Sequence, residues 1–534
     1  MLREGPKLPV KQITILAICR FAEPVVYTSV LPYLPEMMES VGVRKNEIAK
    51  WVGISSAVVA GCQCIMAVPW GTFSDRFGRK YTILLGLTST MIFSLVFGFS
   101  QSLTMLLVSR AFIGLGNANV GIIRTMVAEL VREKELQPLA FSMMPLVWSI
   151  GSIFGPAFGG ALANPAVKHP EIFGNWEIFR KYPFALPNII SAILFIIGIT
   201  TGFLFLEETL ESRKHKRDYG LILGRLLTQS CSSRRSHPYQ HDHHDSTVNE
   251  RTGLLISDEE SRNSSSHEGD NTSKAPTYGT ANTINDDNPD YDIVEPKKDA
   301  SSKFKTIFTW QSTLTLMVYG MLAMHSMGFD SLFPVFLHHP KQDLVNNPDV
   351  NLPFQFTSGF GLGSQKIGIL YTLNGATGIF VQFVFFPMAA RRWGVLRCFK
   401  VVAICFPFIY FITPFLVLIP ESISMIVIYL LLMIKMTLGM FAFPCTTILL
   451  TNTASSLKTL GTLNGVGVSV SAIGRAAGPA LVGEAFTAGV KAGYMIVPWW
   501  ILTALTVISA IPVFWIEEKD GFTPDEEDDN DGDE

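Results

Sequence analysis

Several ionisable residues stand inside long apolar stretches of this chain. In the first stretch Arg20 and Glu23 are one helical turn apart on a shared face, and Tyr27 follows a turn later. Charged groups at membrane depth are costly and commonly serve ion or proton movement. Burial opposes the charge of such a carboxylate and a neighbouring cation favours it, so its protonation can be tuned. Glu23 is therefore the preferred proton carrier, and a fixed Arg20–Glu23 pair that only holds helices together is the alternative.

Later apolar stretches add further polar groups. We interpret Arg110 as the charge partner of Glu23 or of a substrate, and Lys435 as its counterpart, for which the sequence identifies no partner. His325 either shuttles protons or hydrogen-bonds across helices. Asp330 is either a second proton carrier or a solvated group near the outer end of its helix. The predicted charge relay comprises Glu23, Arg20, Arg110, His325 and Asp330, and the predicted substrate-binding residues are Tyr27, Asn117, Asn119, Arg124, Asn374 and Lys435.

The charge of the substrate stays open at this stage. Buried Arg110, Arg124 and Lys435 favour an anionic or zwitterionic solute, whereas Glu23 and Asp330 favour a cation.

Membrane-spanning helices must position these residues. The chain has 534 residues, of which 48% are hydrophobic and only 16% charged, and a bilayer core takes roughly 20 apolar residues per helix. About twelve segments qualify: 13–34, 48–70, 81–100, 103–128, 139–163, 183–206, 307–337, 366–389, 396–419, 423–450, 460–488 and 496–516. The expected fold class is an all-α membrane protein with twelve transmembrane helices in two six-helix bundles. Its expected parts are 1–206, a hydrophilic insert at 207–305, a second bundle at 306–516 and an acidic tail at 517–534.

Basic residues in alternate loops favour a cytosolic location for both termini. The insert is rich in Ser, Asn, Asp and His and is expected to be disordered. Its Glu250-Arg-Thr-Gly-Leu254-Leu255 fits an acidic dileucine sorting pattern, which favours a vacuolar or lysosome-like membrane over the plasma membrane. A His- and Asp-rich run at 237–245 is more readily a solvated polar segment than a loose metal site. We predict no metal site and no cofactor.

The two halves repeat one another. G-x-x-x-G-P occurs at Gly151, Gly155 and Pro156, followed by Gly159 and Gly160, and again about 320 residues later from Gly474. Ser29-Val-Leu-Pro32 matches Ser331-Leu-Phe-Pro334, a register that sets Glu23 opposite His325 and Thr28 opposite Asp330. Two related bundles in the same order are typical of secondary transporters.

Two motifs carry a family resemblance. The loop residues Gly71, Asp75, Arg76, Gly78, Arg79 and Lys80 resemble the loop-two signature of the major facilitator superfamily, which implies a latch between the two bundles. The glycine-proline motif from Gly151 to Gly160 resembles the span-five motif of its drug:proton antiporters. Together with Trp70 and Ser142, these motifs are most similar to the zinc-induced-facilitator-like subfamily, although we do not find its short Cys-containing motif. The resemblance implies proton-coupled transport and places Arg110 at a position linked to proton transfer.

The function expected from the sequence is proton-coupled secondary transport, by antiport, of a small solute through alternating access. The alternative is a non-transporting membrane sensor or scaffold that signals through the insert. An enzyme is not expected, because no Walker loop, nucleophile elbow or metalloprotease pattern occurs. The expected partners are a small molecule or ion, protons, the lipid bilayer and sorting adaptors on the insert, with no nucleic acid. We expect a monomer.

Overall fold

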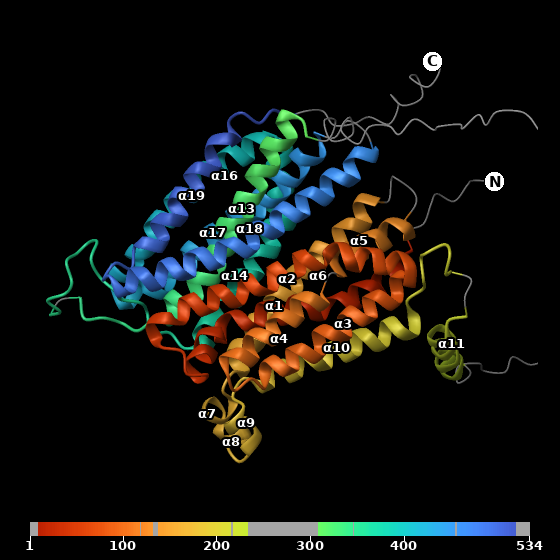
Figure 1. Ribbon diagram of the computed structural model, residues 1–534, viewed down its shortest axis with the longest axis horizontal. Coiled ribbons are helices and arrows are strands. Elements are labelled where there is room, and N and C mark those ends of the chain that lie inside the picture. Colours follow the sequence, from red (N-terminus) through yellow and green to blue (C-terminus); the bar gives the residue numbers. More distant parts are fainter. Residues whose placement is uncertain are drawn as a thin grey trace, which may run out of the picture. The chain divides into compact units, whose positions relative to one another are not determined.

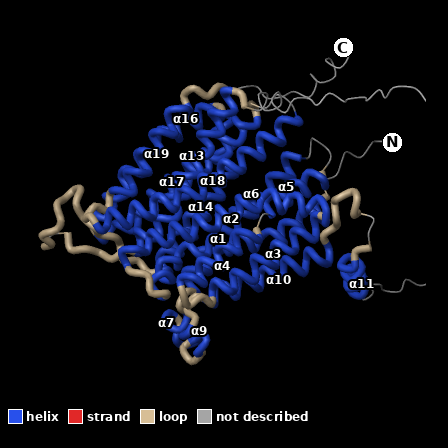
Figure 2. The backbone as a smooth tube through the Cα atoms, viewed as in Figure 1, coloured by secondary structure: helices blue, strands red, loops and turns tan. Residues whose placement is uncertain are grey.

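The computed structural model describes residues 9–117, 119–131, 137–214, 217–232, 308–344, 346–453 and 457–518. These residues are nearly all helical, and within the same ranges extended pairing is limited to two isolated bridges. Figure 2 shows the helices as blue tubes joined by tan loops. Both groups of helices belong to one compact unit, Met1–Thr228 together with Ser301–Glu534.

The first half of the chain supplies the helices drawn from red to yellow in Figure 1. Its long helices are α1 (Val10–Ser40), α2 (Ile48–Phe77), α3 (Arg79–Gly98), α4 (Leu103–Gly116), α5 (Asn119–Leu130), α6 (Gln137–Leu162) and α10 (Ala185–Phe205). Shorter elements are the 3-10 turn η1 (Lys45–Glu47) and the helices α7 (Pro165–Lys168), α8 (Pro170–Phe173), α9 (Glu177–Lys181) and α11 (Tyr219–Ser232).

The second half is drawn from green to blue in the same view (Figure 1). Its helices are α13 (Trp310–His338), α14 (Ser364–Phe380), α15 (Phe386–Trp393), α16 (Val395–Ile412), α17 (Glu421–Thr451), α18 (Leu457–Lys491) and α19 (Val497–Val513). A π-helical turn, η2 (Val381–Phe385), joins α14 to α15, and a 3-10 turn, η3 (Thr413–Leu418), extends α16.

Each of the twelve predicted segments is helical, which confirms the predicted helical membrane fold. Within the described ranges, nine stretches are long and apolar enough to cross a membrane by length and composition. The number twelve itself stays a prediction.

Two expectations need correction. The predicted helix 103–128 is two helices, because Asn117 leaves helical geometry (φ −114°, ψ 80°) between α4 and α5. The first part of the predicted disordered insert also forms a helix, α11. The polar composition of the insert predicted disorder. Helix α11 is instead stabilised by tertiary contacts of Asp218, Gly220 and Gly224, which are described below.

The repeated glycine motifs bring helices into close contact. On α6, a Cβ added at Gly159 would lie 1.9 Å from the backbone oxygen of Ser29 on α1. On α18, a Cβ at Gly478 would lie 2.0 Å from the backbone oxygen of Met324 on α13. Small residues at such positions let helix backbones approach closely in membranes. Each motif helix therefore packs on the first helix of its own half.

The last glycine of each motif contacts the other half. A Cβ at Gly160 would lie 2.6 Å from the backbone oxygen of Ser364 on α14, and one at Gly483 would lie 2.4 Å from that of Ala49 on α2. The sequence repeat is thus also a repeat of packing, and α6 and α18 join the two halves.

Candidate functional site

The polar centre of the first half is Glu23, whose residue surface is 1% exposed. Its Oε2 accepts a hydrogen bond from Arg20 Nη1 at 3.3 Å, one turn earlier on α1. Its Oε1 accepts one from Asn119 Nδ2 at 2.9 Å. Asn119 is the first residue of α5, so the break after α4 brings this amide to α1. The proton affinity of a buried carboxylate depends on the groups that bond to it, here one cation and one neutral donor.

Arg110 has different partners from those predicted. Its Nε donates to Ser55 Oγ on α2 at 3.0 Å, and its guanidinium lies 5.3 Å from the centre of the Phe97 ring. The cation that pairs with Glu23 is Arg20, because Glu23 meets the start of α5 whereas Arg110 on α4 faces α2 and α3. The prediction that Arg110 pairs with Glu23 is corrected accordingly, and its alternative role as the charge partner of a substrate stays a prediction.

Two of the predicted substrate-binding residues contact each other in the first half. Asn117 Nδ2 donates to the Tyr27 hydroxyl at 3.1 Å, one turn beyond Glu23 on α1. Of the other two in this half, Asn119 bonds to Glu23 and Arg124 on α5 is exposed.

In the second half, Lys435 and Asp330 form an ion pair between α17 and α13. The Lys435 ammonium also lies 5.0 Å from the centre of the Phe329 ring. Asp330 is the partner of Lys435 that the sequence did not identify. His325 is buried, with Nδ1 3.1 Å from the Tyr410 hydroxyl and its ring edge-on to Phe406. The Asp330–Lys435 pair therefore joins a residue of the predicted relay to a predicted substrate-binding residue.

Several buried polar atoms along the spans have no hydrogen-bond partner within the described part of the chain. They are Arg20 Nε, Asn117 Oδ1, Asn119 Oδ1, Tyr371 Oη, Asn374 Oδ1, Arg475 Nε and Trp499 Nε1. Buried polar groups are nearly always satisfied, so such atoms suit water or a polar solute. Four of these seven residues belong to the predicted site. Arg475 was missed, although its place inside the second glycine motif was a usable signal.

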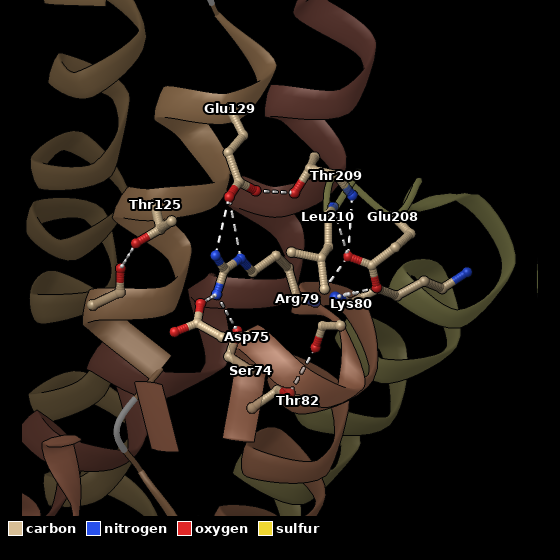
Figure 3. Close-up of polar contacts among 12 residues, drawn as sticks. Ser74, Asp75, Arg79, Lys80, Thr82, Thr125, Glu129, Glu208, Thr209 and Leu210 are labelled. Atoms are coloured by element: carbon tan, nitrogen blue, oxygen red, sulfur yellow. Dashed lines mark hydrogen bonds and ion pairs between the residues drawn. The ribbon is translucent and has the colours of Figure 1, made fainter. Parts of the chain in front are cut away.

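A second polar cluster surrounds the turn from α2 to α3 (Figure 3). Gly78 makes the turn with φ +107°, a conformation that favours glycine. Arg79 Nη1 donates to Asp75 Oδ1 at 2.5 Å, and Arg79 Nη2 donates to Glu129 Oε1 on α5 at 3.1 Å. We call the residues Asp75, Gly78, Arg79, Lys80, Glu129 and Glu208 the α2–α3 loop cluster.

Glu208 and Lys80 attach this cluster to the segment after α10. Glu208 accepts the backbone amides of Arg79 and Lys80 at 2.8 and 3.2 Å, which places a negative charge at the positive end of α3. Lys80 is completely buried, and its ammonium donates to Asp218 Oδ2 at 2.6 Å and to the backbone oxygen of Phe203 at 2.9 Å. The side chains of Asp75 and Arg76 are exposed. The described hydrogen bonds and ion pairs of this cluster all lie within the first half.

The family of the chain is decided by comparison with known proteins. A profile described as Major Facilitator Superfamily matches residues 16–479. The chain belongs to the major facilitator superfamily. It is a multi-pass membrane transporter and not an enzyme.

Its relatives agree with this assignment. A major facilitator superfamily multidrug transporter, mfsB of Aspergillus fumigatus, is 37% identical over 96% of this chain and 84% of its own length. ZINC INDUCED FACILITATOR-LIKE 1 of Arabidopsis thaliana is 24% identical over 91% of this chain and 85% of its own. A bacterial homologue of the human lysosomal transporter Spinster, in an inward-facing and occupied conformation, shares the fold. Its TM-score is 0.60 at 13% identity, over 97% of this chain and all of that one.

Polar contacts between the halves of this major facilitator protein gather at one end of the helices. Lys50 at the start of α2 pairs with Glu484 near the end of α18 at 3.1 Å. Glu36 on α1 accepts the backbone amide of Ser364 at 2.5 Å, and Ser364 Oγ also contacts Lys168 on α7. Burial lowers the pKa of the Lys168 ammonium, and the Glu36 carboxylate opposes this shift. The α2–α3 loop cluster lies at the opposite end of α2.

The predicted sorting residues Glu250, Leu254 and Leu255 and the His- and Asp-rich run at 237–245 lie outside the described residues. The other predicted site residues are described.

Proposed function

We propose that this transporter is a proton-coupled antiporter that moves a small organic solute by alternating access of its two halves. The observation that carries the proposal is the environment of Glu23, a carboxylate 1% exposed that is held by Arg20 and Asn119. A group that alternates between an ion pair and a neutral acid needs a cation that can be released, and Arg20 is that cation.

The coupling step follows from the charges. With Glu23 ionised, its two oxygens accept hydrogen bonds from Arg20 and Asn119, and the pair is locally neutral. Protonation of Glu23 removes its negative charge and leaves Arg20 an unpaired buried cation, which is costly. The halves then reach a lower free energy in an arrangement that exposes Arg20 to water or to a solute. Proton binding and solute binding thereby influence each other through Arg20.

The solute site is proposed at the polar atoms without partners, on Asn117, Asn119, Asn374 and Arg475. These residues come from both halves, so a solute bound among them would respond to rocking of one half against the other. The multidrug transporter of Aspergillus fumigatus supports an organic solute of moderate size. The Asp330–Lys435 pair is proposed to hold the second half together beside this site.

Rocking is supported by the distribution of contacts between halves. Lys50–Glu484 and Glu36–Ser364 hold one end together. At the other end, the α2–α3 loop cluster bonds within the first half. We propose that the described state is closed at the end that holds Glu36 and that the cluster engages the second half in the opposite state.

The test is flux into proteoliposomes under an imposed pH gradient, with a panel of cationic drugs, amino acids and metal ions. Wild-type protein should move at least one of these solutes with the gradient. Glu23→Gln should keep the exchange of that solute at equal pH but lose its dependence on the gradient. Gradient-independent flux that is unchanged in Glu23→Gln would overturn proton coupling. The absence of any flux from a verified folded sample would favour a sensor, for which the comparisons offer no support.

We further propose cytosolic termini, a monomer, and delivery to a vacuolar or lysosome-like membrane by adaptors that bind Leu254 and Leu255. Replacing both leucines by alanine should move the protein to the plasma membrane in fluorescence microscopy. Unchanged localisation would remove the sorting role.

A further inference from the structure

Helix α11 starts from an anchored residue. Asp218 directly precedes it, and Asp218 Oδ1 accepts the backbone amides of Gly220 and Leu221 at 2.9 and 3.2 Å. An aspartate that satisfies the first amides stabilises the start of a helix. The other oxygen of the same carboxylate accepts the buried Lys80 ammonium at 2.6 Å. The start of α11 is therefore tied to the α2–α3 loop cluster.

Two glycines on one face of α11 let it pack closely against α10. A Cβ at Gly220 would lie 2.1 Å from the backbone oxygen of Phe203, and one at Gly224 would lie 2.2 Å from that of Leu204. Phe203 and Leu204 belong to the last turn of α10. Two contacts on successive turns fix the direction of α11 as well as its start.

The neighbouring face of α11 is a stripe of large apolar side chains. Tyr219 is 75% exposed and Leu226 is 58% exposed, and the other three residues of the pattern are also exposed. The stripe consists of Tyr219, Ile222, Leu223, Leu226 and Leu227. Their spacing of three and four residues places them on one side of the helix. Leaving such large apolar side chains in water is unfavourable, so the stripe calls for an apolar partner.

Basic residues border this stripe. Arg225 lies at its edge on the helix, and Lys214 and Arg217 precede the helix; all three are exposed. An amphipathic helix with an apolar face and flanking arginines lies in the interface of a membrane and is attracted to anionic lipids. Helix α11 lies against the last turn of α10, which is long and apolar enough to cross a membrane.

We propose that α11 is an interfacial helix that buries its apolar stripe in the membrane surface and binds anionic phospholipid headgroups through Arg217 and Arg225. Because Asp218 joins α11 to Lys80, lipid binding stabilises the α2–α3 loop cluster. The surface does not depend on the proposed proton coupling.

The test measures hydrogen–deuterium exchange of residues 219–228 in the full-length protein. Samples are compared in phosphatidylcholine nanodiscs with and without phosphatidylserine, and in detergent. We expect slower exchange in nanodiscs than in detergent, and slower still with phosphatidylserine. Leu226→Asp should speed exchange in nanodiscs by at least about tenfold, because it removes the apolar contact of that side chain with the membrane. Thr228→Asp is the matched control, since it adds the same charge to an exposed position on the opposite face, and it should have little effect.

Arg225→Gln separates the charge from the apolar contact. It should remove the phosphatidylserine-dependent protection and keep the protection found in phosphatidylcholine alone. Equal exchange in detergent and in both nanodiscs would overturn the proposal, since it would mean that another part of the chain covers the stripe or that nothing does. Equal effects of Leu226→Asp and Thr228→Asp would overturn it as well.

Discussion

The turn from α2 to α3 and the turn from α15 to α16 have similar backbone conformations but different patterns of charged residues. Gly78 and Gly394 both have positive φ, at +107° and +82°, and each directly precedes the next helix. Glu208, after α10, accepts the first amides of α3, and Glu518, after α19, accepts the amide of Leu396 at 3.4 Å. A glycine turn and a carboxylate cap are therefore present in both halves.

The acidic residue before the glycine and the two basic residues after it are present in the first half only. In the repeat register Arg391 stands at the position of Asp75, Val395 at that of Arg79 and Leu396 at that of Lys80. The glycine allows the tight turn, and the carboxylate accepts backbone amides at the start of the next helix, which would otherwise lack partners. The ion pairs of Arg79 and Lys80 are additional to this turn and cap. They therefore indicate a function that is specific to the first half. The polar centres differ in the same way, since Glu23 corresponds to His325.

The largest expected effect tests which half carries the proton. Glu23→Gln should abolish gradient-driven flux in proteoliposomes, and it should also lower the free energy of unfolding, because it leaves the buried Arg20 without its anionic partner. Asp330→Asn should keep coupling and lower the free energy of unfolding by about 1–2 kcal/mol, because it leaves Lys435 unpaired. The loss is below that of a fully buried pair, since the Asp330 side chain is 36% exposed. Coupling lost in Asp330→Asn but kept in Glu23→Gln would reverse the comparison.

The next prediction concerns what the halves share. Gly159→Ala on α6 and Gly478→Ala on α18 should each destabilise the protein by about 2–3 kcal/mol, because the new methyl group overpacks a helix contact. Both clashes are with backbone oxygens, at 1.9 and 2.0 Å. Gly439→Ala is the control, since no atom lies within 4 Å of its added Cβ. Thermal unfolding in detergent measures all three, and a control as unstable as the others would refute the packing argument.

A smaller effect sharpens the contrast between the turns. Arg79→Gln should cost about 1.5–3 kcal/mol, because it removes charge-assisted hydrogen bonds to Asp75 and Glu129. In the second turn Arg391, which stands at the position of Asp75, is exposed, and Arg391→Gln should change stability by no more than about 0.5 kcal/mol. Denaturation of the two variants under one condition gives the comparison, and equal losses would show that both turns carry an ion network.

The smallest effect is a dependence on pH at the end of α13. Burial lowers the pKa of His339 from 6.5 to about 4, whereas the register places Met37 at this position in the first half. The unfolded chain then binds a proton more readily than the folded chain between these values, so stability should fall as pH falls from 6.5 towards 4. His339→Gln should flatten this part of the pH profile of the unfolding temperature. An unchanged profile in His339→Gln would contradict the assignment.

Much of the architecture follows from the sequence alone. Apolar segments of sufficient length, basic residues between them and the repeated glycine motifs depend on composition and local spacing, which the bilayer constrains strongly. The Arg20–Glu23 contact is also local, since one helical turn separates the two residues. The turn at Gly78 could be predicted because positive φ favours glycine.

Tertiary structure decided which polar groups meet. Lys435 pairs with Asp330 on another helix. Glu23 accepts a hydrogen bond from Asn119 because the helix breaks at Asn117. Arg110 donates to Ser55 and does not pair with Glu23. Helix α11 lies in a segment whose polar composition did not predict it. Asp218, which precedes this helix, pairs with the buried Lys80, more than a hundred residues earlier in the chain. The physical reason is the same in each case. Periodicity in the sequence determines which side of a helix is apolar, but the rotation and neighbours of that helix depend on how all the helices pack.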